Sequence, residues 1–231
     1  MFVGLLRWVR RLVVLSVVAS MVAVIVCRIV DPPITPLVVI RAVQAIATGR
    51  LPNYARSWRD LDAVSPSLVR AVIAAEDEAF FAHHGFDLGA IRRAQAWNVR
   101  HPNRIPRGAS TITMQTARNV FLWPGRSYVR KALEAWFAML MELVWGKRRI
   151  LEVYLNVIEW GDGIYGAEAA SRHYFDVSAS ALGPDQAAFL SAIIPNPRGV
   201  YNPTTHRKRV EHRKALIQRL MRHVVVPRDL N

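Results

Sequence analysis

One glutamate, Glu76, occupies a position at which an amphipathic helix should carry an apolar side chain. Val69, Val72 and Ile73 follow helical spacing, and the next residue on the same stripe is Glu76. One interpretation is that residues 76–78 form a solvated acidic helix end. The other is a carboxyl held in an apolar pocket, where desolvation raises its pKa. Such a carboxylate suits the role of a general base near neutral pH.

A second glutamate, Glu134, stands among cations. Arg130 precedes it by four residues and Lys131 by three, so the three side chains share one helix face. Arg118 and Arg126 flank a nearby Trp-Pro-Gly turn and could join this group. The plainer interpretation is an exposed ion pair. However, the apolar residues that follow predict a buried helix, and several cations around one carboxylate suit a phosphate or diphosphate ligand.

Helices should position these side chains, because the sequence has helical periodicity and lacks a convincing alternating β pattern. Capping residues and turn signals predict helices over residues 65–78, 87–100, 110–122, 127–145, 147–158, 166–174, 184–194 and 205–222. Ser65, Asp87, Ser110 and Ser127 are the expected N-caps. The last helix is strongly basic, and we interpret its first run, His206-Arg207-Lys208-Arg209, as a solvated face, with contact to anionic lipid as the alternative. The predicted fold class is therefore mainly α.

The amino terminus resembles a membrane segment. Residues 12–30 carry no charge apart from Arg28, which can reach the headgroups, and three arginines precede them. A cleaved signal peptide is the alternative, although a cleavage site would fall awkwardly inside the apolar run. We expect a basic cytoplasmic segment at 1–11, a transmembrane helix at 12–30, a membrane-proximal connector at 31–62 and a folded domain at 63–231.

Composition narrows the function classes. The chain has 231 residues and a formal net charge of +14, which suits anionic headgroups or an anionic substrate. A nucleic-acid partner is not expected, because a translocated domain rarely meets one and no such motif is present. The single cysteine, Cys27, excludes an internal disulfide framework and a cysteine-based zinc site.

Five motifs, in order, resemble those of the family 51 peptidoglycan glycosyltransferases. They are Glu76-Asp77-x-x-Phe80-x-x-His83-x-Gly85-Phe86-Asp87; Gly108-Ala109-Ser110-Thr111-Ile112-x-x-Gln115; Arg130-Lys131-x-x-Glu134; Arg149-Ile150-Leu151-Glu152-x-Tyr154-Leu155-Asn156 with the glycines beyond it; and Ala187-x-x-x-Leu190 to Pro195-Asn196-Pro197. Met114 departs from the second motif, where many members carry a further glutamine. The chain is too short for the added penicillin-binding domain of bifunctional members and lacks its Ser-x-x-Lys tetrad.

The resemblance implies a lysozyme-like α fold that polymerises lipid II into β-1,4 glycan strands, with inversion and release of undecaprenyl diphosphate. It implies a single-pass protein of the inner membrane with a periplasmic catalytic domain. Its partners would be lipid II, the nascent strand and the membrane, and other cell-wall synthases could join them. A lysozyme-like lytic muramidase and a non-catalytic scaffold are the rival functions.

The same resemblance assigns roles to residues. Glu76 matches the general base, and Glu134 matches a second glutamate on the donor diphosphate side. Six more match positions that bind the substrate or supply cations: Ser110, Gln115, Arg118, Arg126, Arg130 and Lys131. No cofactor is certain and no residue is assigned to a metal, but a divalent cation, Mg²⁺ or Mn²⁺, could sit near Glu134. His83 is more typical of a structural hydrogen bonder than of a metal ligand.

Overall fold

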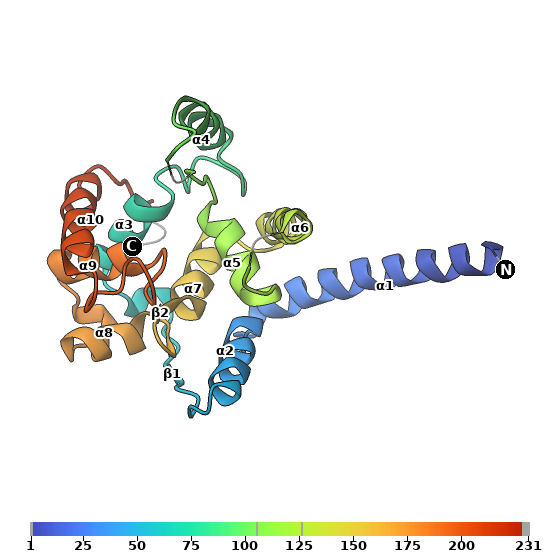
Figure 1. The fold of residues 1–231 in the computed structure, drawn as a ribbon, viewed down its shortest axis with the longest axis horizontal. Helices are drawn as coiled ribbons and strands as arrows, with labels where there is room; N and C mark the ends of the chain where they lie inside the picture. Colours follow the sequence, from blue (N-terminus) through green and yellow to red (C-terminus); the bar gives the residue numbers. More distant parts are fainter. Residues whose placement is uncertain (1, 105, 126, 228–231) are drawn as a thin grey trace.

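The chain is mainly helical in the computed structural model, which describes residues 2–104, 106–125 and 127–227 (Figure 1). The α-helices are α1 (Phe2–Ile29), α2 (Pro36–Ala47), α3 (Pro66–Glu76), α4 (Leu88–Arg100), α5 (Ile112–Phe121), α6 (Tyr128–Val144), α7 (Lys147–Val157), α8 (Ala167–Phe175), α9 (Pro184–Ile193) and α10 (Arg207–Leu220). Two short 3₁₀ helices lie at Leu61–Ala63 and Ala179–Ala181. The predicted fold class is confirmed.

Side-chain caps explain where several helices begin. The hydroxyl of Ser65 accepts a hydrogen bond from the amide of Ser67 at 3.2 Å, and Asp87 and Ser127 cap α4 and α6 in the same way. The prediction for α5 was wrong by one residue. Thr111 is its N-cap and accepts from the Met114 amide at 3.2 Å, whereas the Ser110 hydroxyl accepts from Lys131.

A small sheet, which the sequence did not predict, joins distant parts of the chain. Strand β3 (Ile164–Tyr165) pairs in parallel with β1 (Ala55–Arg56) and antiparallel with β2 (Glu159–Gly161). Strands of two or three residues are too short to display an alternating pattern. Through β1, the segment that follows α2 is hydrogen-bonded to the folded domain.

The core lies between two groups of helices. One group places α3 against α9 and α9 against α10, and the other holds α5 between α6 and α7. Large side chains that are fully buried fill the space between them, namely Leu68, Ile73, Phe80, Ile112, Ile150, Leu151, Tyr154, Leu155, Trp160 and Leu190. This packing brings the end of α3, the start of α5 and the middle of α10 together.

The first helix projects away from the rest of the molecule (Figure 1). Within the described residues, its segment Gly4–Ile29 is the one helix that is long and apolar enough to cross a membrane. Indole and guanidinium N–H groups of the domain donate hydrogen bonds to the last turns of this helix. Trp136 bonds the Ser20 hydroxyl at 3.0 Å, Trp145 bonds a carbonyl one turn further on, and Arg149 bonds the Cys27 carbonyl.

Candidate active site

The carboxylate of Glu76 is held by two partners at the end of α3. Its Oε2 accepts from Gln115 Nε2 at 2.9 Å, and its Oε1 accepts from Arg213 Nη2 at 2.8 Å. The hydroxyl of Tyr154 donates to Gln115 Oε1 at 3.1 Å, which orients the amide. The Glu76 side chain is 10% exposed. The interpretation as a solvated acidic end therefore fails for this residue.

The surroundings of Glu76 change its acidity. Burial raises the pKa of its carboxyl above the usual range, because water no longer stabilises the charge. The Arg213 charge, the Gln115 hydrogen bond and the Arg118 charge oppose that effect without cancelling it. Burial also raises the pKa of Tyr154 well above its ordinary value, and the nearby Glu76 charge adds to the increase. Glu76 is therefore a stronger base than an exposed carboxylate.

The neighbouring residue, Asp77, fixes the geometry of the first motif. Its carboxylate accepts from His83 Nε2 at 2.9 Å and from the amide of Ile112 at 3.0 Å. The Thr111 hydroxyl donates to the carbonyl of Gly85 at 2.7 Å, so a second bond ties this loop to the start of α5. His83 is the structural hydrogen bonder that its motif position suggested. Sequence reasoning gave Asp77 no role, although it lies in the same motif.

Glu134 is buried and forms ion pairs with two cations. Arg130 Nη1 bonds its Oε1, and Lys131 Nζ lies 3.1 Å from its Oε2. The side chains of Glu134 and Arg130 are 3% and 9% exposed, whereas that of Lys131 is 45% exposed. The alternative of an exposed ion pair is therefore wrong for Glu134. Lys131 remains accessible to a ligand.

The first turns of α5 connect the two glutamates. Gln115 bonds Glu76, while Lys131 reaches the Ser110 hydroxyl at 2.7 Å and the Met114 sulfur at 3.9 Å. The structure thus brings Ser110, Gln115, Arg130 and Lys131 around the start of one helix, with a buried acid on either side. Arg126 lies outside the described residues.

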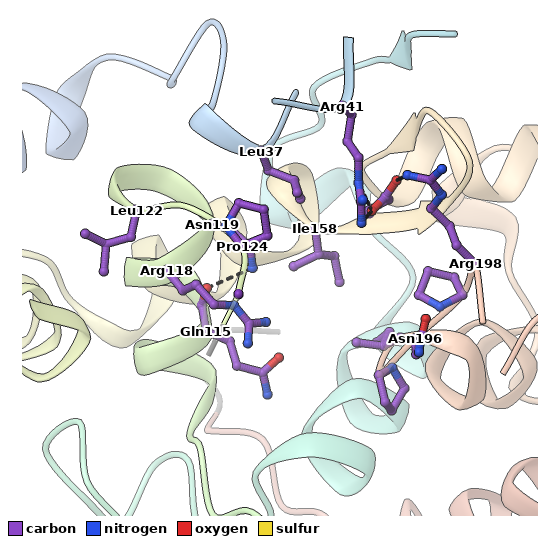
Figure 2. Close-up of a pocket in the computed structure, with 15 residues that line it drawn as sticks. Leu37, Arg41, Gln115, Arg118, Asn119, Leu122, Pro124, Ile158, Asn196 and Arg198 are labelled. Carbon is purple, nitrogen blue, oxygen red and sulfur yellow. Dashed lines mark hydrogen bonds and ion pairs between the residues drawn. The ribbon is translucent and has the colours of Figure 1, made fainter. Parts of the chain in front are cut away.

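A cavity of about 230 Å³ adjoins this arrangement (Figure 2). Gln115, Arg118 and Asn119 of α5 line one side, and Asn196 and its neighbours after α9 line the other. Figure 2 shows the Gln115 and Arg118 side chains on the α5 side, opposite the loop after α9. Glu76 is joined to the cavity through Gln115. Glu159 in the same wall pairs with Arg41 and Arg198. Arg118 is therefore the guanidinium best placed for an anionic ligand.

The carboxylates present do not favour a metal held by the protein. Within the described residues, no three His, Cys, Asp or Glu side chains gather closely enough to bind an ion. Both oxygens of Glu134 already face cations, and Asp77 is satisfied by His83 and a backbone amide. Such donor sets leave little for a divalent cation to gain. We therefore assign no step to a metal.

Comparisons with known proteins give the family of this chain. The sequence model of the transglycosylase family matches residues 43–222, from within α2 to just beyond α10. The chain belongs to the transglycosylase family. This match confirms the resemblance that the five motifs indicated. It also covers the helices that carry Glu76, Gln115, Glu134 and Arg213.

Three relatives within the transglycosylase family cover most of the chain. All three are named biosynthetic peptidoglycan transglycosylase. The protein from Xanthomonas campestris pv. campestris is 49% identical over 96% of this chain and 89% of its own length. The Caulobacter vibrioides protein is 53% identical over 83% of each chain, and the Bdellovibrio bacteriovorus protein is 49% identical over 83% of this chain and 76% of its own.

Proposed function

We propose that the chain is a membrane-anchored peptidoglycan glycosyltransferase that polymerises lipid II. The observation that carries this proposal is Glu76, a buried and oriented carboxylate beside a cation-lined cavity in a member of the transglycosylase family. A hydroxyl nucleophile needs a base to take its proton, and an anionic leaving group needs fixed positive charge. Glu76 is the candidate base, and the cations near the cavity are the candidate positive charges.

The proposed reaction transfers the growing strand to lipid II. The acceptor 4-hydroxyl oxygen attacks the anomeric carbon of the donor, and its proton passes to Glu76. The bond from that carbon to the diphosphate oxygen breaks, and undecaprenyl diphosphate leaves with the electron pair. Attack from the face opposite the leaving group converts the α linkage into a β-1,4 bond. The raised pKa of the Glu76 carboxyl makes it a competent acceptor for this proton.

The cations of α5 and α6 are proposed to stabilise the leaving diphosphate. Lys131 is partly exposed and bonds Ser110, so both can turn toward a phosphate oxygen. Arg118 lines the cavity, and Arg130 holds Glu134 in place. The negative charge that develops on the leaving oxygen makes these contacts stronger in the transition state than in the ground state. Arg126 is proposed to join them on its motif position alone.

The membrane arrangement follows from α1. We propose that this helix crosses the inner membrane once and holds the catalytic domain on the periplasmic side, where lipid-linked substrate is presented. Three arginines near its start, Arg7, Arg10 and Arg11, favour a cytoplasmic amino terminus. The bonds from Trp136, Trp145 and Arg149 reach residues within the spanning segment, so they would hold this side of the domain against the bilayer.

An assay with purified lipid II tests the proposal against lytic cleavage. We expect polymer to form and undecaprenyl diphosphate to be released. Shortening of preformed strands without polymer formation would instead support a muramidase. The cations around the cavity favour transfer, because a lytic enzyme that uses water has little need for diphosphate contacts. A scaffold would show neither activity, and its Glu76→Gln and Glu134→Gln variants would complement as well as wild type.

Replacement of Arg118 by alanine should weaken binding of diphosphate-containing analogues by at least roughly tenfold, since a hydrogen bond to a charged group contributes about 1.5–3 kcal/mol. Binding of the bare disaccharide should change little. Isothermal titration with both ligands measures the difference. Arg219→Ala, an exposed change on α10, is the control. Equal losses for the two ligands would argue against a diphosphate contact.

A further inference from the structure

A residue outside the five motifs touches the proposed base. Arg213 lies on α10, and its Nη2 donates to Glu76 Oε1 at 2.8 Å and to the Ala75 carbonyl at 3.2 Å. Its guanidinium also lies over the Tyr201 ring, 5.4 Å from the centroid. The side chain is 23% exposed. Three different groups therefore hold the guanidinium against the carboxylate.

The two oxygens of Glu76 are fixed from two different helices. Gln115 of α5 holds Oε2, and Arg213 of α10 holds Oε1. Each carboxylate oxygen has two lone pairs, so both keep one for an incoming hydroxyl. The plane of the carboxylate is thus set before substrate binds. Pre-orientation of this kind lowers the barrier of a proton transfer.

Stability alone does not explain the position of Arg213. Its Nε is buried and has no hydrogen-bond partner in the described part of the chain. A buried donor without a partner is destabilising, and native proteins retain few of them. The contact with Glu76 offers a functional reason for the position.

We propose that Arg213 is a positioning residue for glycosyl transfer, which orients the Glu76 carboxylate and keeps it ionised until the acceptor hydroxyl arrives. This inference rests on the proposed function. The groups that face Glu76 are Arg213 of α10, Arg118 and the neutral Gln115 of α5, and beyond that amide Tyr154 of α7. On its own element, Asp77 follows Glu76, and its carboxylate is engaged by His83.

The Arg213 charge favours the ionised form of the Glu76 carboxyl. Burial favours the protonated form of Glu76, and the Arg213 charge is the largest influence against it. Loss of that charge should therefore raise the pKa of the Glu76 carboxyl further. Because the base must be deprotonated to act, the acid limb of the pH–rate profile should move to higher pH.

The test compares the pH profiles of kcat/KM for lipid II polymerisation. Arg213→Gln removes the charge and keeps a polar side chain. In this variant the midpoint of the acid limb should move to higher pH by about 1–3 units. Its rate on the alkaline side should reach a plateau below that of wild type, because the carboxylate has lost one of the two partners that orient it. Arg213→Lys keeps the charge and should show a much smaller shift. Arg209→Ala, an exposed change on the same helix, should leave the profile unchanged.

A direct titration separates this inference from the proposed function. Glu76 can be followed by ¹³C-glutamate NMR, assigned with Glu76→Gln, in wild type and in Arg213→Gln. An unchanged Glu76 pKa, or a rate loss equal at every pH, would overturn the role of Arg213. If wild type makes no polymer, the proposed function fails, and the titration still decides the coupling. If Arg213→Gln does not fold, Arg213→Lys provides the test. It must show a lower maximal rate and a small shift of the acid limb. A pH profile of Arg213→Lys identical to that of wild type would refute the role.

Discussion

Glu76→Gln should lower the rate of glycan polymerisation by at least roughly two orders of magnitude, as expected when a general base is removed. The amide has nearly the same volume as the carboxyl but cannot accept the hydroxyl proton. Arg213 would keep its bond to the Ala75 carbonyl and its place over the Tyr201 ring, so the end of α3 should stay in position. The measurement is kcat/KM with lipid II, together with the thermal unfolding midpoint.

The chain offers a matched control two residues away. Glu78 is exposed, whereas Glu76 and Asp77 are shielded, so Glu78→Gln changes the same local charge without touching the site. It should retain nearly full activity. Turnover by Glu76→Gln close to that of wild type would refute the base assignment. A large fall in the unfolding midpoint would show that the substitution disturbs the fold rather than the proton transfer.

Local chemistry made much of the site predictable. The carboxylate of Glu76 stood out because a charge fell on an apolar helix stripe, and burial of that stripe brought it inside. The group of Arg130, Lys131 and Glu134 was predictable from spacing alone, because residues three and four apart meet on one helix face. What spacing could not decide was whether Glu134 is exposed. That depends on how α6 packs against α5, which is a tertiary property.

The same stripe argument could have identified Arg213. Val210 and Ile217 are both buried, and Arg213 lies between them at helical spacing. The many cations of α10 hid this signal, since a basic helix is usually a solvated face. Its partner is 137 residues away in the chain, and no local rule predicts so distant a pairing. The Ser110 cap was wrong for a related reason: Ser110 and Thr111 are both good caps, and a distant lysine binds the former.

Glu134→Gln should lower the free energy of unfolding by about 3 kcal/mol, because breaking a buried ion pair leaves the other charge without compensation. Arg130 is nearly as buried as Glu134, and its Nε already has no hydrogen-bond partner in the described residues. For a chain of this size the unfolding midpoint should fall by roughly 6–12 °C. Differential scanning calorimetry or a fluorescence melt in detergent would measure it.

The same substitution should also reduce polymerisation by roughly two orders of magnitude at temperatures where the variant stays folded, since misplacing a group by about 1 Å can cost that much. Lys131 loses one partner and no longer holds the Ser110 hydroxyl at the start of α5 in the same geometry. Glu211→Gln is the control, because Glu211 pairs with Lys214 at the same spacing but is exposed, and its loss should cost less than about 1 kcal/mol. A Glu134→Gln variant with the midpoint and the rate of wild type would mean that neither the buried pair nor its link to α5 matters to the enzyme.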